Sequence, residues 1–276
     1  MLLSAHAQVA VPQDQTTILS AFETGSGSAE ETDAFKIQLG GFLLSSIKTT
    51  FSLTDADGNG GQEVDFKKDL GGNSSLNVFR LDGEWRFADR HKILFTYYDL
   101  NQTASRVIDK EIEWGGEIYP INTTINTQFK TTIYKLDYGY NFFKSENRNH
   151  ELNGLIGFHI TSFKTAISEA ARGSSEGVSV TAPLPVVGLE WKAKLTEKLT
   201  SKVSFEYFGV SLDNKYTGNL SDFQALLEYR LNGNWSLGGG YNRYTMRATV
   251  KGDGGRLKLS TRHSYNGLML FASTHF

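Results

Sequence analysis

A sustained alternation of apolar and polar side chains is the feature that most restricts how this chain can fold. From Phe35 to Leu53 the odd positions are mostly apolar, whereas the even positions include Lys36, Gln38 and Lys48. A period of two indicates a β-strand with one apolar and one polar face. Strands of globular proteins usually have about 5–6 residues, but a tilted strand that crosses a bilayer needs about 9–11 and often projects beyond it. The alternation therefore predicts a membrane-spanning β-barrel.

The same pattern recurs along the chain. In VFRLDGEWRF, residues 78–87, each odd position is apolar or glycine and the even positions from 80 to 86 are all charged. We predict about ten antiparallel strands, at 35–53, 78–87, 91–101, 124–143, 150–165, 179–195, 199–212, 220–231, 235–249 and 257–276. Strand counts of eight and twelve are the alternatives, since 62–68 and 107–119 can be read as additional strands.

The connections between these strands alternate in length. The short ones are ADR, KSENRN, TEK and NGN. The connections that alternate with them are mostly longer; they are 54–75, 102–123, 166–178, 213–219 and 250–256. Outer-membrane barrels have short periplasmic turns, long external loops and an even number of strands. Aromatic residues also gather beside the short turns, as in an interfacial girdle; they are Trp85, Phe87, Tyr140, Phe142, Trp191, Tyr229, Trp235 and Phe276.

The chain ends on LMLFASTHF, and counting back in twos from Phe276 gives Thr274, Ala272, Leu270 and Leu268 as one face. On these features, residues 34–276 resemble the bacterial outer-membrane β-barrel proteins. The resemblance implies an all-β, antiparallel, up-and-down transmembrane barrel in a Gram-negative outer membrane, in contact with lipid and lipopolysaccharide. It also implies that Phe276 is the signal presented to the barrel-assembly machinery. It identifies no functional subfamily, and a soluble all-β protein is the alternative.

The N-terminus and the composition set further limits. MLLSAHAQ contains an A-x-A pattern, so we read residues 1–7 as the end of a cleaved signal peptide and 8–33 as a flexible periplasmic lead-in, with an ordinary frayed terminus as the alternative. Cysteine is absent, which excludes disulfides and thiolate metal sites. A net charge of -2 argues against binding to nucleic acid, and no apolar run is long enough for a transmembrane helix.

If the apolar positions face lipid, the opposite positions line the lumen. They include the cations Lys36, Lys48, Arg80, Arg86, Lys135, Lys192, Lys202 and Arg230, and the anions Asp82, Glu84, Asp137, Glu190, Glu206, Asp222 and Glu228. Charges buried in a narrow tube persist when they are paired or hydrated, and wide aqueous pores appear at 16–18 strands. We therefore expect a charge network that leaves the lumen closed or very narrow.

A possible calcium loop lies in the first long connection. Asp55, Asp57, Asn59 and Gly60 match the opening of an EF-hand loop, but its twelfth position, which should be Glu, is Phe66. We favour a polar turn over a calcium site, and we expect no metal and no cofactor.

Histidines are the remaining candidates for chemistry. His263-Ser264 is similar to the His-x-Ser pair of the outer-membrane lipid A deacylases, but neighbours on a strand point to opposite faces, so the histidine cannot activate the serine. His159 points inward together with Glu151, Asn153 and Thr161, and we expect it in a hydrogen-bond network. The omptin proteases are also ten-stranded barrels with an Asp-His pair at the rim, and no matching Asp-x-His follows here.

The expected function is that of a small integral outer-membrane protein that is not an enzyme and acts structurally or through its loops. The loop 102–123, with Trp114 and Tyr119, is predicted to form an external hairpin that touches lipopolysaccharide or a partner. A narrow porin-like channel is the alternative, and a rim hydrolase is a third possibility. The sequence leaves the oligomeric state open.

Overall fold

A computed structural model of the chain describes residues 33–55, 63–73, 75–114, 117–169, 175–212, 216–251 and 257–276. The ten long strands are β1 (Phe35–Asp55), β3 (Leu76–Ala88), β4 (His91–Val107), β7 (Thr124–Lys144), β8 (His150–Glu169), β9 (Ser175–Lys194), β10 (Leu199–Leu212), β11 (Tyr216–Arg230), β12 (Trp235–Lys251) and β13 (Leu257–His275). Three short strands accompany them: β2 (Glu63–Asp65), β5 (Ile112–Trp114) and β6 (Glu117–Tyr119). The expected signal-peptide end and nearly all of the lead-in lie outside the described residues.

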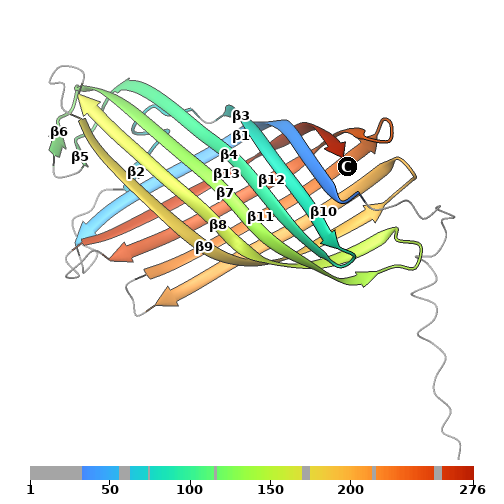
Figure 1. Ribbon diagram of the computed structural model, residues 1–276. Helices are drawn as coiled ribbons and strands as arrows, with labels where there is room; N and C mark the ends of the chain where they lie inside the picture. Colours follow the sequence, from blue (N-terminus) through green and yellow to red (C-terminus); the bar gives the residue numbers. More distant parts are fainter. Residues whose placement is uncertain are drawn as a thin grey trace, which may run out of the picture.

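The long strands form one closed antiparallel barrel. Each pairs with its neighbours in chain order, and β13 returns to β1 with Lys36 opposite His275 and Asp55 opposite Leu257. The C-terminus and the short turns lie at one end, and β5 and β6 lie at the other (Figure 1). The prediction of ten strands is therefore confirmed. The short strands do not cross the barrel wall: β2 adds to the edge of β1, and β5 pairs with β6 alone.

In the described ranges, no helix is long and apolar enough to span a membrane.

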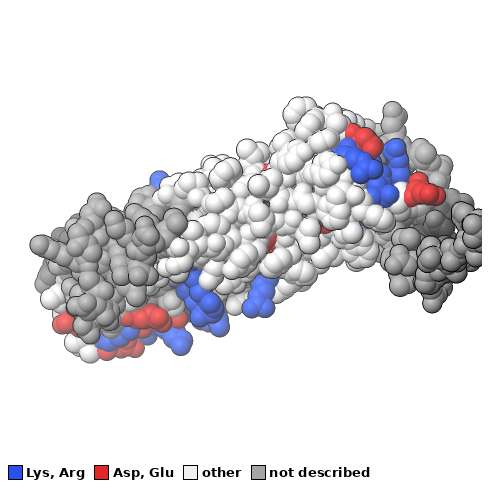
Figure 2. Space-filling model, turned by 90° about the horizontal axis from the view of Figure 1, so that it is seen from below, with Lys and Arg blue, Asp and Glu red and all other residues white. Residues whose placement is uncertain are grey.

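An apolar belt surrounds the half of the barrel that carries the short turns. On β7 it runs from Phe142 to Tyr134, which corresponds to about 20 Å along the barrel axis and approaches the roughly 25 Å band of outer-membrane barrels. Figure 2 shows one face of the barrel as a largely uncharged band, with charged side chains gathered toward the two ends. Large exposed aromatic residues border the belt at the turn end, where the sequence predicts a girdle: Trp85, Phe87, Tyr140, Phe142, Trp191, Tyr229, Trp235 and Phe276.

Above the belt the wall reverses its polarity. On β7 the outward residues change from Tyr and Phe to Gln128, Asn126 and Thr124, while Ile133, Phe129 and Ile125 are buried inside. The barrel therefore leaves the lipid partway along its length, and its distal half has the polar exterior and apolar interior of a water-soluble β-protein.

The apolar interior consists of two clusters. We call the first the plug; it contains Phe42, Leu44, Ile47, Val78, Tyr98, Leu100, Ile133, Val186, Leu220, Leu226, Tyr244, Met246, Tyr265, Met269 and Phe271. We call the second, nearer the long-loop end, the cap; it contains Phe51, Val64, Phe66, Leu70, Ile108, Ile112, Tyr119, Ile125, Phe129 and Ile167. The sequence predicts Tyr119 as an exposed loop aromatic, and this is wrong: it packs in the cap because β5 and β6 fold over the lumen. The side chain of Trp114 is outside the description.

A β-bulge in β1 marks the change of polarity. The register with β13 shifts between Leu44 and Ser46, so that the strand gains one residue at Ser45. One extra residue exchanges the two faces of a strand. Ile47 is therefore buried, and Lys48 is exposed on the outer wall. The prediction that Lys48 lines the lumen is wrong for this reason.

Deletion of Ser45 tests the role of the bulge. Without it, the strand would alternate regularly from Leu44 onward, so that Ile47 stays buried and Lys48 stays on the outer wall, and we expect the barrel to fold without the bulge. Heat-modifiable migration of the refolded protein on a gel measures this. The control Ser45→Ala keeps the bulge and removes an exposed hydrogen bond of 3.0 Å to Asn266, which should cost at most about 1 kcal/mol. Failure of the deletion variant alone to fold would refute the assignment of Ser45 as the inserted residue.

Candidate functional site: the lumen charge network

Below the plug, at the level of the lipid belt, the lumen is filled by charged side chains from many strands. Lys92 of β4, although 1% exposed, is ion-paired across the barrel with Glu190 of β9 at 2.5 Å and lies 3.6 Å from Glu84 of β3. Arg86 reaches Glu151 at 3.0 Å and Glu84 at 3.8 Å. Because these carboxylates each face a cation inside the low-dielectric wall, the layer is mutually compensated.

A second group closes the network at the turn end, next to the start of β1 and the end of β13. Lys36 pairs with Glu228, which also accepts hydrogen bonds from Ser273 at 2.5 Å and His275 at 3.0 Å. Arg230 pairs with Asp33, which precedes β1. Although partial burial raises the pKa of the Asp33 carboxyl, hydrogen bonds from His275 and Arg230 lower it below its ordinary value.

The third group lies directly under the plug. Lys135 of β7 bridges Glu206 of β10 at 2.8 Å and Asp222 of β11 at 3.0 Å. Arg80 holds Asp82 through two nitrogens, at 2.8 and 2.9 Å, and its guanidinium lies 5.1 Å from the ring centre of Tyr98 in the plug. This cation–π contact joins the charged layer to the apolar one.

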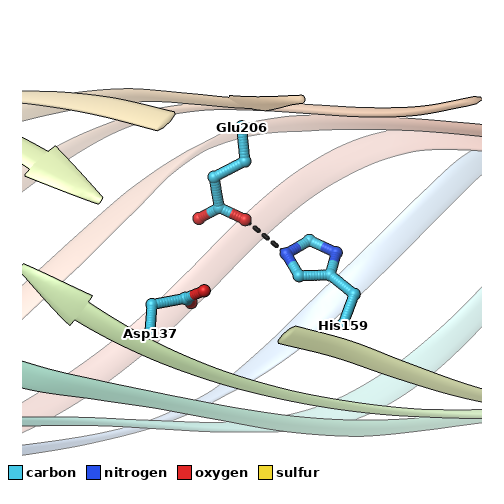
Figure 3. A group of neighbouring side chains, drawn as sticks. All are labelled: Asp137, His159 and Glu206. Carbon is cyan, nitrogen blue, oxygen red and sulfur yellow. Dashed lines mark hydrogen bonds and ion pairs between the residues drawn. The ribbon is translucent and has the colours of Figure 1, made fainter. Parts of the chain in front are cut away.

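Asp137, His159 and Glu206 have the composition of a metal site. Their ligand atoms lie within 4.8 Å of one another, and Figure 3 shows Glu206 hydrogen-bonded to His159 while Asp137 reaches toward the same space. However, the Glu206 oxygen that accepts from His159 is also the one bound by Lys135. The Lys135 ammonium supplies the positive charge that a metal ion would otherwise bring, so the cluster is an internal ion-pair site. That the protein uses no metal or cofactor stays a prediction.

The structure brings most of the predicted lumen residues together. In the interior lie Arg80, Asp82, Glu84, Arg86, Lys135, Asp137, Glu190, Lys202, Glu206, Glu228 and Arg230, and Lys192 lines a cavity at the turn end. Sequence reasoning missed Lys92 and His275. Lys92 shares its inward face with Leu94, Thr96 and Tyr98, so the sequence pattern did not identify that face as charged. His275 could have been assigned to the lumen, because it alternates with Phe276, which faces outward.

The space left between these side chains is small. A cavity of about 40 Å³ lies among Arg80, Lys135 and Glu190. A second, of about 80 Å³, lies among Arg86, Lys192 and Glu228 at the turn end. A single water needs about 10–15 Å³ of such volume, so each of these two cavities holds only a few waters.

The other candidates from the sequence do not form a catalytic site. His263 is buried and bonds Thr49 through its Nδ1 at 2.9 Å, whereas Ser264 faces the outer wall. The histidine and serine therefore point to opposite faces, as the strand geometry predicts. Of the calcium candidates, Asp57 and Asn59 lie outside the described residues, as does the side chain of Asp55.

Replacement of Lys92 by Met tests the charge layer. Glu84 and Glu190 would then be buried with less compensation, which typically costs about 3–5 kcal/mol. We expect a lower midpoint of urea unfolding, followed by tryptophan fluorescence of the protein refolded in vesicles. The matched control is Lys130→Met on the outer wall, whose 3.0 Å pair with Asp99 is exposed and should leave the midpoint unchanged. Equal midpoints for both variants would contradict a stabilising role for the layer.

Comparisons with known proteins support the fold. No protein-family model and no curated protein sequence matches the chain. The outer membrane protease OmpT of Escherichia coli matches with a TM-score of 0.53 and 10% identity, over 89% of this chain and 99% of that one. The translocator domain of the autotransporter NalP of Neisseria meningitidis matches with a TM-score of 0.42 and 14% identity, over 94% of each chain. Closure, belt, girdle and the likeness to OmpT agree: the chain is a transmembrane β-barrel with the fold of the bacterial outer-membrane proteins.

Proposed function

We propose that the protein is a closed outer-membrane barrel that neither conducts solutes nor catalyses a reaction, and that it acts through the surface it presents outside the membrane. The observation that carries this proposal is the apolar plug across the lumen. At its centre the rings of Tyr244 and Tyr265 stack with centroids 4.9 Å apart, and the Tyr98 and Tyr265 hydroxyls are hydrogen-bonded. A hydrated ion or sugar would have to displace these packed rings to pass.

The charge network supports the same proposal from below the plug. Selective pores display rings of one sign that attract a permeating ion. Among the described lumen residues both signs are present and most of them are paired, as in Lys92 with Glu190 and Lys135 with Glu206. A permeating ion would have to break such pairs, which leaves buried charges uncompensated.

The placement of the histidines supports a non-enzymatic role. His159 and His263 are both 0% exposed, beneath the cap and inside the wall, so they have no access to a substrate. The other described histidines, His91, His150 and His275, lie at the turn end. OmpT is a protease by name, but a likeness at 10% identity carries the fold and no active site.

Conductance in planar bilayers tests the closed barrel. We expect no current steps from the refolded full chain, because packed rings of the plug and paired charges lie across the lumen. Protection of the strands from added protease, with cleavage of protein left outside the vesicles, serves as proof of insertion. Stable, saturable openings from inserted protein would overturn the proposal and favour the narrow channel.

Phe276 is proposed as the residue that the assembly machinery recognises. Its backbone closes the seam, with the Phe35 N–H donating to the Phe276 carbonyl at 3.0 Å and the Phe276 N–H donating back at 2.8 Å. Its ring, by contrast, is 63% exposed at the turn end. The ring is therefore available to a partner, and the backbone bonds do not depend on it.

Phe276→Ala tests this assignment. We expect a several-fold lower level of assembled protein in cells, with unchanged refolding in vitro, because the backbone seam persists. The matched control is Trp235→Ala, which removes an aromatic residue of similar exposure at the same end of the barrel. If the two variants assembled equally well in cells, a specific role of Phe276 would be refuted.

A further inference from the structure

A cluster of cations lies on the outer wall just beyond the apolar belt. It occupies three neighbouring strands, with Arg243 and Arg247 on β12, Arg262 on β13 and Lys48 on β1. All four side chains are exposed, and they surround the outward hydroxyl of Ser264. We call these four residues the basic patch.

The strand register shows how closely the patch is arranged. Ser264 stands opposite Thr245 on β12 and opposite Lys48 on β1. One pleat further from the belt, Arg262 stands directly opposite Arg247, and one pleat nearer the belt Asn266 stands opposite Arg243. Because outward neighbours along a strand are about 6.6 Å apart and adjacent strands about 4.8 Å apart, the four cations lie around one small area.

The direct pairing of Arg247 with Arg262 needs a counter-charge. Like charges opposite each other in a sheet are destabilising, and within the described part of the chain none of the four patch residues has an ion-pair partner. Another pair of like charges on the outer wall, Lys130 opposite Lys164, does have a carboxylate partner: Asp99 lies 3.0 Å from Lys130. The described residues thus compensate one pair internally and supply no counter-charge to the other.

The neighbouring carboxylates do not neutralise the patch. The basic patch lies in a groove of the outer wall. Glu63 and Asp65 of β2, which stand opposite Ser52 and Thr50 of β1, line the same groove. Asp65 accepts hydrogen bonds from the backbone N–H groups of Lys67 and Lys68, both at 2.9 Å, and so caps its own turn. Four cations against two carboxylates leave the groove with two net positive charges.

The position of the patch identifies the anion's environment. Arg243 lies two residues beyond Tyr241, and Asn266 two residues beyond Leu268, which are the last large apolar side chains of the belt on β12 and β13. The patch is on the side of the belt opposite the short turns, which corresponds to the outer leaflet. Anionic groups at that height belong to the headgroups of the surrounding lipid.

The groove also has the chemistry of a sugar-phosphate site. It encloses about 580 Å³ and is lined by hydroxyl and amide groups in addition to the cations. These groups are Ser46, Thr50, Ser52, Thr245, Thr249, Ser260, Ser264 and Asn266. Arginine forks bind phosphate oxygens in a bidentate manner, and hydroxyls hydrogen-bond to sugars.

We propose that the basic patch binds the phosphate groups of a phosphorylated glycolipid of the outer leaflet, with Arg247 and Arg262 sharing one phosphate and Lys48 and Arg243 flanking it. The inference rests on the proposed orientation of the barrel in the outer membrane. It gives the exposed surface a specific lipid partner, and it accounts for an opposed pair of arginines that has no counter-charge of its own.

Titration of the refolded full chain in neutral detergent micelles tests the site, with bisphosphorylated lipid A as the probe. The variant is the double substitution Arg247→Gln and Arg262→Gln, and the matched control is Lys130→Gln with Lys164→Gln. Loss of charge-assisted bonds from two arginines should weaken binding about tenfold or more. The control should bind like the unaltered protein, and added salt should weaken binding in proportion to screening.

Two further probes decide the source of the phosphate. Lipid A that has been enzymatically dephosphorylated should bind at least tenfold more weakly, and inorganic phosphate at millimolar concentration should not compete. Equal binding of the dephosphorylated lipid, or an unaltered affinity of the arginine variant, would overturn the proposal, and full competition by inorganic phosphate would overturn the glycolipid source.

The outcome is separable from that of the proposed function. Both double variants are first checked for heat-modifiable migration, which establishes that the barrel is folded. If the unaltered protein conducts and still binds the lipid, the closed barrel is refuted and the lipid site is retained. If it does not conduct and does not bind the lipid, the lipid site is refuted and the closed barrel is retained.

Discussion

Closure of the β-sheet is the constraint on which the rest of the structure depends. In hydrocarbon no water is available to unpaired backbone groups, so a sheet can cross a bilayer only when its first and last strands are joined. Here β1 and β13 pair from Lys36 and His275 at one end to Asp55 and Leu257 at the other. Once the ring is closed, alternate side chains must point into a lumen of limited width. The composition of that lumen then decides what the barrel can do.

The solvent outside the wall determines the polarity inside it. Within the belt the outward side chains meet lipid, and the inward positions carry Lys92, Lys135 and their carboxylate partners. The plug begins at the height of the belt, where Met269 and Phe271 alternate with the outward Leu268 and Leu270, and it continues beyond the belt, where the outward side chains meet water and the cap follows. The two interior layers meet where Arg80 lies over Tyr98. In the proposed function both layers close the lumen, one by apolar packing and the other by paired charge.

The sequence was sufficient for the architecture and for much of the charge network. Alternation located the strands, connection lengths fixed the topology, and parity placed residues such as Arg80 and Glu206 inside. It failed where a residue's environment depends on strands distant in sequence. The plug was invisible because Tyr98, Tyr244 and Tyr265 meet from three strands. Lys92 lay on a face that looked apolar, and Tyr119 belonged to a loop whose fold over the lumen has no local signal.

The bulge at Ser45 connects the interior of the barrel with its exterior. A uniform alternation through β1 would place Lys48 among the tyrosines of the plug and Ile47 in water. The inserted residue reverses both positions, so that Ile47 packs in the plug and Lys48 stands opposite Ser264 in the basic patch. A single irregularity in one strand thus contributes to packing the plug and to assembling the charged outer surface. Because the two consequences share one backbone feature, the apolar interior and the outward cations are parts of the same structural solution.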